Sequence, residues 1–112
     1  MQPKTNRHQE SLMHYYLPNL ATLKRLSGFY GVFSDPARVK ILTALSIAEL
    51  CVTDIARFCC MPQSTVSHQL QTLRQHNLVS TRREGKVIYY AISSPYVAKT
   101  LEIGAEYLHA PR

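Results

Sequence analysis

Residues 53–77 decide the fold, and they read TDIARFCCMPQSTVSHQLQTLRQHN. They predict two short helices joined by a tight turn, because Pro62 cannot continue the first helix. In the second helix, Val66, Leu70 and Leu73 recur at i, i+4 and i+7, the spacing that places side chains on one face of an α-helix. That face is therefore expected to pack on the core.

The opposite face of the second helix is polar. Its side chains are short or forked hydrogen-bonding groups, which can reach base edges in the major groove of DNA. No acidic residue occurs between Asp54 and Glu84, whereas four arginines do. Such a segment can approach phosphates. We therefore interpret residues 53–77 as a helix-turn-helix whose second helix reads duplex DNA.

The chain is small and basic, with 112 residues, a formal net charge of +6 and a sequence pI of about 9.5. A chain of this length forms one domain, and a second subunit is expected to complete any large buried core. We therefore expect a homodimer. The positive charge is compatible with a polyanionic partner, although many basic proteins bind none.

The first residues, MQPKTNRHQE, lack the apolar core of a secretory signal, and no run approaches the roughly 18 apolar residues of a membrane span. A soluble, cytoplasmic protein without membrane contact is expected. Three cysteines, with Cys59 and Cys60 adjacent, make a poor disulfide framework and indicate a reducing compartment.

The N-terminal part divides into an arm and a helix. Residues 1–10 are expected to be a flexible arm, and residues 11–112 a single domain. A helix is expected from about residue 18 to 32, with too many apolar residues for one narrow stripe. So broad an apolar surface indicates burial against a second subunit, or alternatively an ordinary helix within the chain.

Cap signals mark three further helices. Asp35 and Pro36 are an N-cap and a first-turn residue, and Thr53 is expected to cap the first helix of the helix-turn-helix. Ser94 and Pro95 repeat the signal at the start of the last helix. We expect the first and last helices to pair across a two-fold axis and form the dimer interface.

Two segments between the predicted helices lack the helical spacing of apolar residues. Residues 49–52 are expected to be a short apolar connection. The β-branched and aromatic residues on both sides of Gly85 predict a two-stranded hairpin. A basic hairpin directly after a DNA-reading helix is expected to be a wing that touches the DNA backbone or a minor groove. The alternative is a solvated turn.

Four segments together resemble the ArsR/SmtB family of dimeric winged helix-turn-helix repressors. The segments are SDPARVKILTAL (34–45), ELCVTDIA (49–56), QSTVSHQLQTLRQHNLV (63–79) and REGKVIYYAI (83–92). The resemblance implies a mainly α fold with a small β-hairpin wing, and a homodimer that binds a palindromic operator. The two reading helices would enter successive major grooves about one helical turn apart. An inducer, commonly a metal or metalloid ion, would release the repressor.

The resemblance and the polar face together give ten candidate DNA contacts. Those expected to reach base edges or the nearest phosphates are Gln63, Ser64, Thr65, Ser67 and His68. Those expected to hold the DNA backbone are Gln71, Arg74, Arg82, Arg83 and Lys86.

The metal-binding positions of the family are mostly replaced. At one family site, suited to zinc-like ions, this chain carries Ser94, Tyr96, Tyr107 and Ala110. None of these is a zinc ligand, so we expect that site to be absent.

The other family site uses the two thiolates of an ELCVCDL motif. Here Cys51 is kept and Thr53 replaces the second thiol, which leaves a weak site for a soft ion. Cys59 falls on an apolar face, where a free cysteine is usually a small hydrophobic group. Cys60 stands where the family has glycine. We hypothesise that all three thiols contribute to a switch, through arsenite, a soft metal ion or oxidation; the identity of the inducer stays open.

Three alternatives to an inducer-released repressor are considered. An enzyme is not expected, because the chain has no Gly-rich phosphate loop, nucleophile elbow or paired carboxylates. The same winged fold could also serve a nucleoid or protein-interaction module without sequence-specific binding. A repressor without a metal site could respond to another signal.

Overall fold

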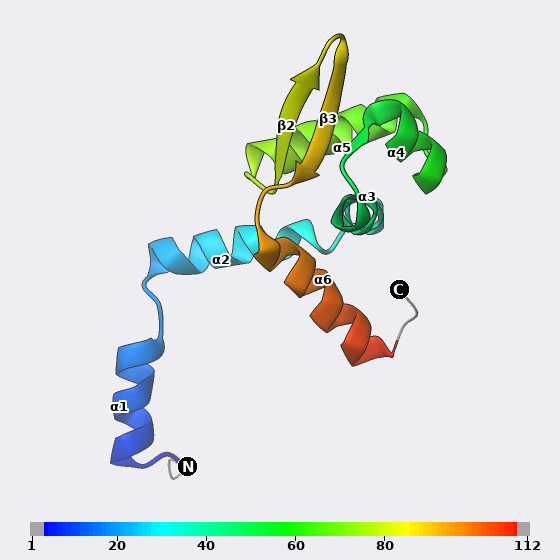
Figure 1. Cartoon of the computed structure of the whole chain (residues 1–112). Helices are drawn as coiled ribbons and strands as arrows, with labels where there is room; N and C mark the ends of the chain where they lie inside the picture. Colours follow the sequence, from blue (N-terminus) through cyan, green and yellow to red (C-terminus); the bar gives the residue numbers. More distant parts are fainter. Residues whose placement is uncertain (1–3, 110–112) are drawn as a thin grey trace. The chain divides into compact units, whose positions relative to one another are not determined.

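The computed structural model describes residues 4–109 (Figure 1). The chain divides into two compact units, residues 1–30 and 31–112, which are described separately. Among the described residues, no helix combines the length and apolarity needed to cross a lipid bilayer.

The N-terminal unit contains helix α1, Arg7–Tyr16, and most of helix α2, Leu20–Val32. A capping box starts α1, because Asn6 Oδ1 accepts from the Gln9 amide at 2.9 Å and Gln9 Oε1 accepts from the Asn6 amide at 3.1 Å. Residues 7–10 of the expected flexible arm are therefore helical. No side chain of α1 is buried.

The C-terminal unit contains four helices and a small sheet. Its elements are α3 (Pro36–Ile47), β1 (Leu50–Cys51), α4 (Val52–Cys59), α5 (Gln63–Gln75), β2 (Val79–Glu84), β3 (Val87–Ile92) and α6 (Pro95–Leu108). The antiparallel sheet has the order β1-β3-β2. This arrangement confirms the mainly α winged helix-turn-helix expected from the sequence.

The core of this unit lies among α3, α4 and α5. The three apolar residues of α5, Val66, Leu70 and Leu73, are each 0% exposed. Helix α5 contacts α3, whose Ile41 and Leu42 are equally buried, and α4. The helical spacing seen in the sequence therefore identified the packed face of α5 correctly.

The N-caps predicted at Asp35 and Ser94 are confirmed. The Asp35 carboxylate accepts from the Ala37 amide at 2.8 Å, and Ser94 Oγ accepts from the Tyr96 amide at 3.2 Å. The bond from Ala37, helped by the Gln69 side chain and by Arg38, lowers the pKa of Asp35 although desolvation opposes it. Both caps satisfy backbone amides that have no partner within their helices.

The start of α4 differs from the expectation. Its N-cap is Cys51, which makes no side-chain cap, and Thr53 lies exposed in the first turn. The physical reason is strand pairing, since Leu50 and Cys51 pair with Tyr90 and Tyr89 of β3 and hold the chain extended up to the helix. The expected apolar connection therefore supplies the third strand of the sheet.

The turn between α4 and α5 is closed by Cys60, which adopts a left-handed conformation with φ 55° and ψ 49°. The next amide, of Met61, donates to Ala56 O at 3.0 Å, so the turn ends α4 as a glycine would. A side chain in this conformation costs roughly 1 kcal/mol relative to glycine. The position of α5 thus depends on a locally strained residue.

We expect Cys60→Gly to raise the free energy of unfolding by about 1 kcal/mol, because glycine removes the clash of Cβ in the left-handed region. Chemical denaturation at fixed protein concentration measures this change. Cys60→Ala is the matched control, since it keeps Cβ and removes only sulfur. Equal stabilities of the glycine and alanine variants would contradict the strain at this turn.

Candidate nucleic-acid interface

The polar face of α5 is open to solvent. The seven candidate residues on this helix are all exposed: Gln63, Ser64, Thr65, Ser67, His68, Gln71 and Arg74. The buried row Val66, Leu70 and Leu73 lies on the other side. Because the buried row fixes the rotation of the helix, the polar row must face outward. The structure therefore brings these seven residues together on one helix surface.

Gln69 is a member of α5 that the sequence did not single out. Its Nε2 donates to Asp35 Oδ2 at 3.4 Å, and Arg38 Nε lies 3.7 Å from the same oxygen. The bond ties the middle of α5 to the first turn of α3. The two residues are 34 positions apart in the sequence, and no local pattern relates them. The contact is therefore visible only in the folded structure.

The hairpin expected as a wing is present. Strands β2 and β3 are joined by a two-residue turn, Gly85 and Lys86, because Glu84 pairs with Val87. Gly85 has φ +62°, a conformation that favours glycine. The turn therefore places Lys86 at the tip of the hairpin.

The three cations of the wing have different surroundings. Arg82 lies beside two carboxylates, since its Nε donates to Glu49 at 2.5 Å and its Nη1 to Glu84 at 2.7 Å. The bonds to Glu84 and Glu49 raise the pKa of Arg82. Arg83 and Lys86 are exposed and form no ion pair with any residue between 4 and 109. The sequence pattern does not reveal that Glu49 is a partner of Arg82, and it does not distinguish the paired Arg82 from Arg83 and Lys86.

The three thiols occupy different environments. Cys51 is half-buried and its Sγ donates to Asp54 Oδ2 at 3.4 Å. Cys59 is buried, which raises the pKa of its thiol, and its Sγ lies 3.9 Å from Lys40 O. Cys60 is exposed. Helix α4 separates Cys51 from Cys59 by roughly 12 Å at 1.5 Å per residue.

The structure thus does not bring the thiols into one cluster. Within residues 4–109, no three His, Cys, Asp or Glu side chains come together as a metal site would require. Ser94, Tyr96 and Tyr107, at the positions of the family's zinc-type site, belong to α6 or its cap. Ala110 lies outside the described residues.

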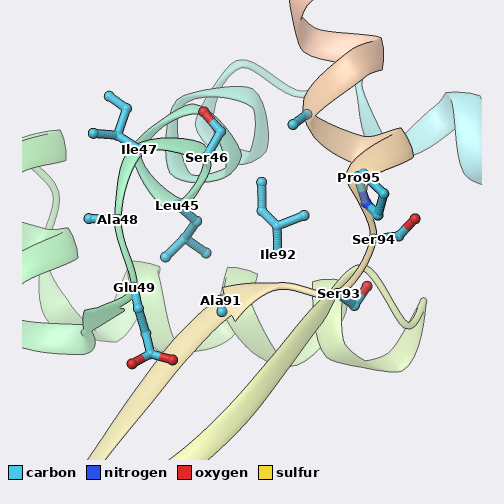
Figure 2. A pocket seen from close by; sticks show the side chains of 11 residues that line it. Leu45, Ser46, Ile47, Ala48, Glu49, Ala91, Ile92, Ser93, Ser94 and Pro95 are labelled. Atoms are coloured by element: carbon cyan, nitrogen blue, oxygen red, sulfur yellow. The ribbon is translucent and has the colours of Figure 1, made fainter.

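A shallow pocket of about 410 Å³ lies where α3 ends, β3 ends and α6 begins (Figure 2). Leu45 and Ile92 point into it, whereas the Glu49 carboxylate points away along the strand (Figure 2). The hydroxyls of Ser46 and Ser93 donate to backbone carbonyls at 2.6 Å. These two hydroxyl donors therefore already have acceptors within the protein.

Comparison with known proteins shows relatives that cover nearly the whole chain. Residues 35–81 match the family described as bacterial regulatory protein, arsR family. A transcriptional repressor SmtB homolog from Synechocystis sp. is 32% identical over 107 residues, which are 96% of this chain and 81% of that protein. The cadmium resistance transcriptional regulatory protein CadC of Listeria innocua is 33% identical over 105 residues, 93% of this chain and 83% of CadC.

A solved structure extends the similarity to three dimensions. A homodimeric winged helix-turn-helix DNA-binding domain from Mycobacterium bovis, described as a possible ArsR-family transcriptional regulator, has a TM-score of 0.72 and 27% identity. The match covers 97% of this chain and 91% of that domain. The fold that carries α5 and the hairpin is therefore shared with a protein described as a DNA-binding domain.

We expect Gln63→Ala to relax the preference for particular base pairs, because a lost base-edge contact removes about 1–3 kcal/mol of discrimination. Arg83→Ala should instead weaken binding to all sequences and lower the magnitude of the salt slope by about 1.

Fluorescence anisotropy with promoter and scrambled duplexes over a salt series measures the sequence preference and the salt slope of each variant. Gln75→Ala, at the exposed end of α5, is the control. Equal losses on both duplexes for Gln63→Ala would contradict direct readout.

Proposed function

We infer that this chain, which belongs to the arsR family of bacterial regulatory proteins, represses transcription as a homodimer on a palindromic operator. One observation carries the proposal, namely the exposed, carboxylate-free polar surface of α5 opposite its buried row. The wing supplies cations beside that surface. Its target would be bacterial DNA, so the protein would act in the cytoplasm. The family consists of transcriptional regulators rather than enzymes.

We assign a role in DNA binding to each of the seven candidate residues on α5. Gln63 would bond an adenine edge, and Thr65 would offer its methyl group to thymine. His68 and Arg74 would contact phosphates, since both can carry a positive charge. Ser64, Ser67 and Gln71 would bond base edges or the nearest backbone oxygens.

Apolar surfaces on the outer helices support the homodimer. In α6 only Val97 is buried, while Ile103, Tyr107 and Leu108 are 64%, 82% and 71% exposed. Helices α1 and α2, with the residue that caps the end of α1, expose further large apolar side chains, which include Leu12, Tyr16, Leu17, Leu20 and Leu23. Exposed apolar faces of this kind mark association surfaces. A second copy of the chain would cover both sets.

The inducer would act through thiols. Cys60 is accessible and lies in the strained turn that sets the position of α5. Cys51 ends β1 and pairs with Tyr89 of the wing strand β3. Binding of arsenite or a soft metal ion, or oxidation, would therefore alter a joint next to the DNA-reading surface. The name of the relative CadC refers to cadmium, which is such an ion.

The homodimer is tested by a charge on α6. We expect Ile103→Asp to give a monomer that loses operator binding, because a dimer interface would bury the new carboxylate without a partner. Analytical ultracentrifugation measures the state and DNase footprinting measures the binding. Val87→Asp, the corresponding change on the wing, should leave the dimer intact.

The wild-type footprint should show two protected half-sites about one helical turn apart. Uniform coating of the DNA would favour a non-specific module instead. A dimeric Ile103→Asp variant would exclude α6 from the interface.

The thiols are tested by replacing all three with serine. We expect arsenite, cadmium or peroxide to release the wild-type protein from DNA and to leave the triple variant bound, because the reactive sulfurs are gone. Anisotropy titrations of each reagent measure release. The double variant Cys51→Ser/Cys60→Ser keeps the buried Cys59 and controls for damage to the core. An unchanged response of the triple variant would rule out thiol control and favour a repressor with another signal.

A further inference from the structure

The two arginines of the wing lie on opposite faces of the sheet. Successive side chains of a strand alternate between faces. In β2, Val79 is buried at 4% exposure and Ser80 is exposed. Arg83 therefore continues the face of the buried Val79. Arg82 continues the face of the exposed Ser80.

The face that carries Arg82 holds a row of residues across all three strands. Arg82 of β2 is paired with Tyr89 of β3, and Tyr89 is paired with Cys51 of β1. The guanidinium lies over the Tyr89 ring, 4.6 Å from its centroid. Beyond the ring it reaches Glu49, which precedes β1 by one residue. The Arg82 side chain therefore crosses the middle strand and ties the hairpin to the end of the α3–β1 linker.

The contacts of Arg82 neutralise its positive charge, so this side chain attracts a DNA phosphate only weakly. Two carboxylates, of Glu49 and Glu84, accept from one guanidinium, so the three charges sum to −1. A phosphate could bind Arg82 only in place of these carboxylates. Arg83 has no such competitor among the described residues and lies on the face of β2 that carries the buried Val79.

A two-stranded hairpin is marginally stable by itself and needs support from other elements. Strand β1 pairs only with residues 89 and 90 of β3. The Arg82–Glu49 bond adds a side-chain tie on the outer face of the same sheet. It joins β2, the strand farthest from β1, to the body of the protein.

We propose that Arg82 is a positioning residue, which holds the wing at its working angle through Glu49 and the Tyr89 ring, and that Arg83 and Lys86 make the wing's contacts with phosphate. The inference rests on the proposed DNA-binding function and assigns separate tasks to residues that the sequence groups together. It also gives Glu49 a role in DNA binding, although Glu49 would repel DNA directly.

A double-mutant cycle on operator DNA tests the inference, with Arg82→Ala, Glu49→Gln and the double variant. We expect each single variant to weaken binding about two- to fivefold, the range of an exposed ion pair, with the salt slope unchanged. The double variant should lose no more than either single variant, because both act through the same tie. Hydrogen exchange of the β2–β3 amides should accelerate equally in all three.

Arg83→Ala is the matched control in the wild-type and Glu49→Gln backgrounds. It should lower the magnitude of the salt slope by about 1 in both and leave the exchange of the wing unchanged. A slope lowered by about 1 in Arg82→Ala, together with tighter binding by Glu49→Gln, would overturn the inference, because it would mean that Arg82 contacts phosphate. Wild-type protein that binds no duplex at low salt would instead overturn the proposed function itself.

Discussion

The fold depends on the burial of one row of side chains, Val66, Leu70 and Leu73 of α5. All three are 0% exposed, and they pack among α3 and α4. Deleting a fully buried leucine side chain costs about 2–5 kcal/mol, so this row sets the rotation of the helix firmly. The rotation in turn determines which residues face solvent. The orientation of the candidate DNA-binding surface is therefore a consequence of core packing, and no charged contact is needed to orient it.

Three tertiary features refine the placement of that surface. Cys60 closes the turn before α5 in a left-handed conformation, and Gln69 ties the helix to the cap of α3 at Asp35. Arg82 ties the wing to Glu49. The buried row thus supplies most of the stability, while these polar and strained contacts adjust the angles. Regulation by a small chemical change is easier at such contacts, because each contributes only a modest free energy.

Much of the fold could be predicted from the sequence, because its signals are local. The spacing of Val66, Leu70 and Leu73, the caps Asp35 and Ser94, and the hairpin around Gly85 all involve residues within a few positions of one another. The features that escaped prediction depend on distant partners. Strand β1 exists only because β3 pairs with it, and Glu49 meets Arg82 across 33 residues. The capping box of Asn6 and Gln9 is also local, but it was not predicted.

The proposed function depends most directly on contact between the exposed face of α5 and duplex DNA. Amide chemical-shift mapping of the labelled protein, titrated with the promoter fragment of its own gene at low ionic strength, tests that claim directly. We expect the largest shifts on residues 63–71 and 83–86, with the buried core little changed. Shifts confined to α1 and α6, or no shifts at any DNA concentration, would contradict it.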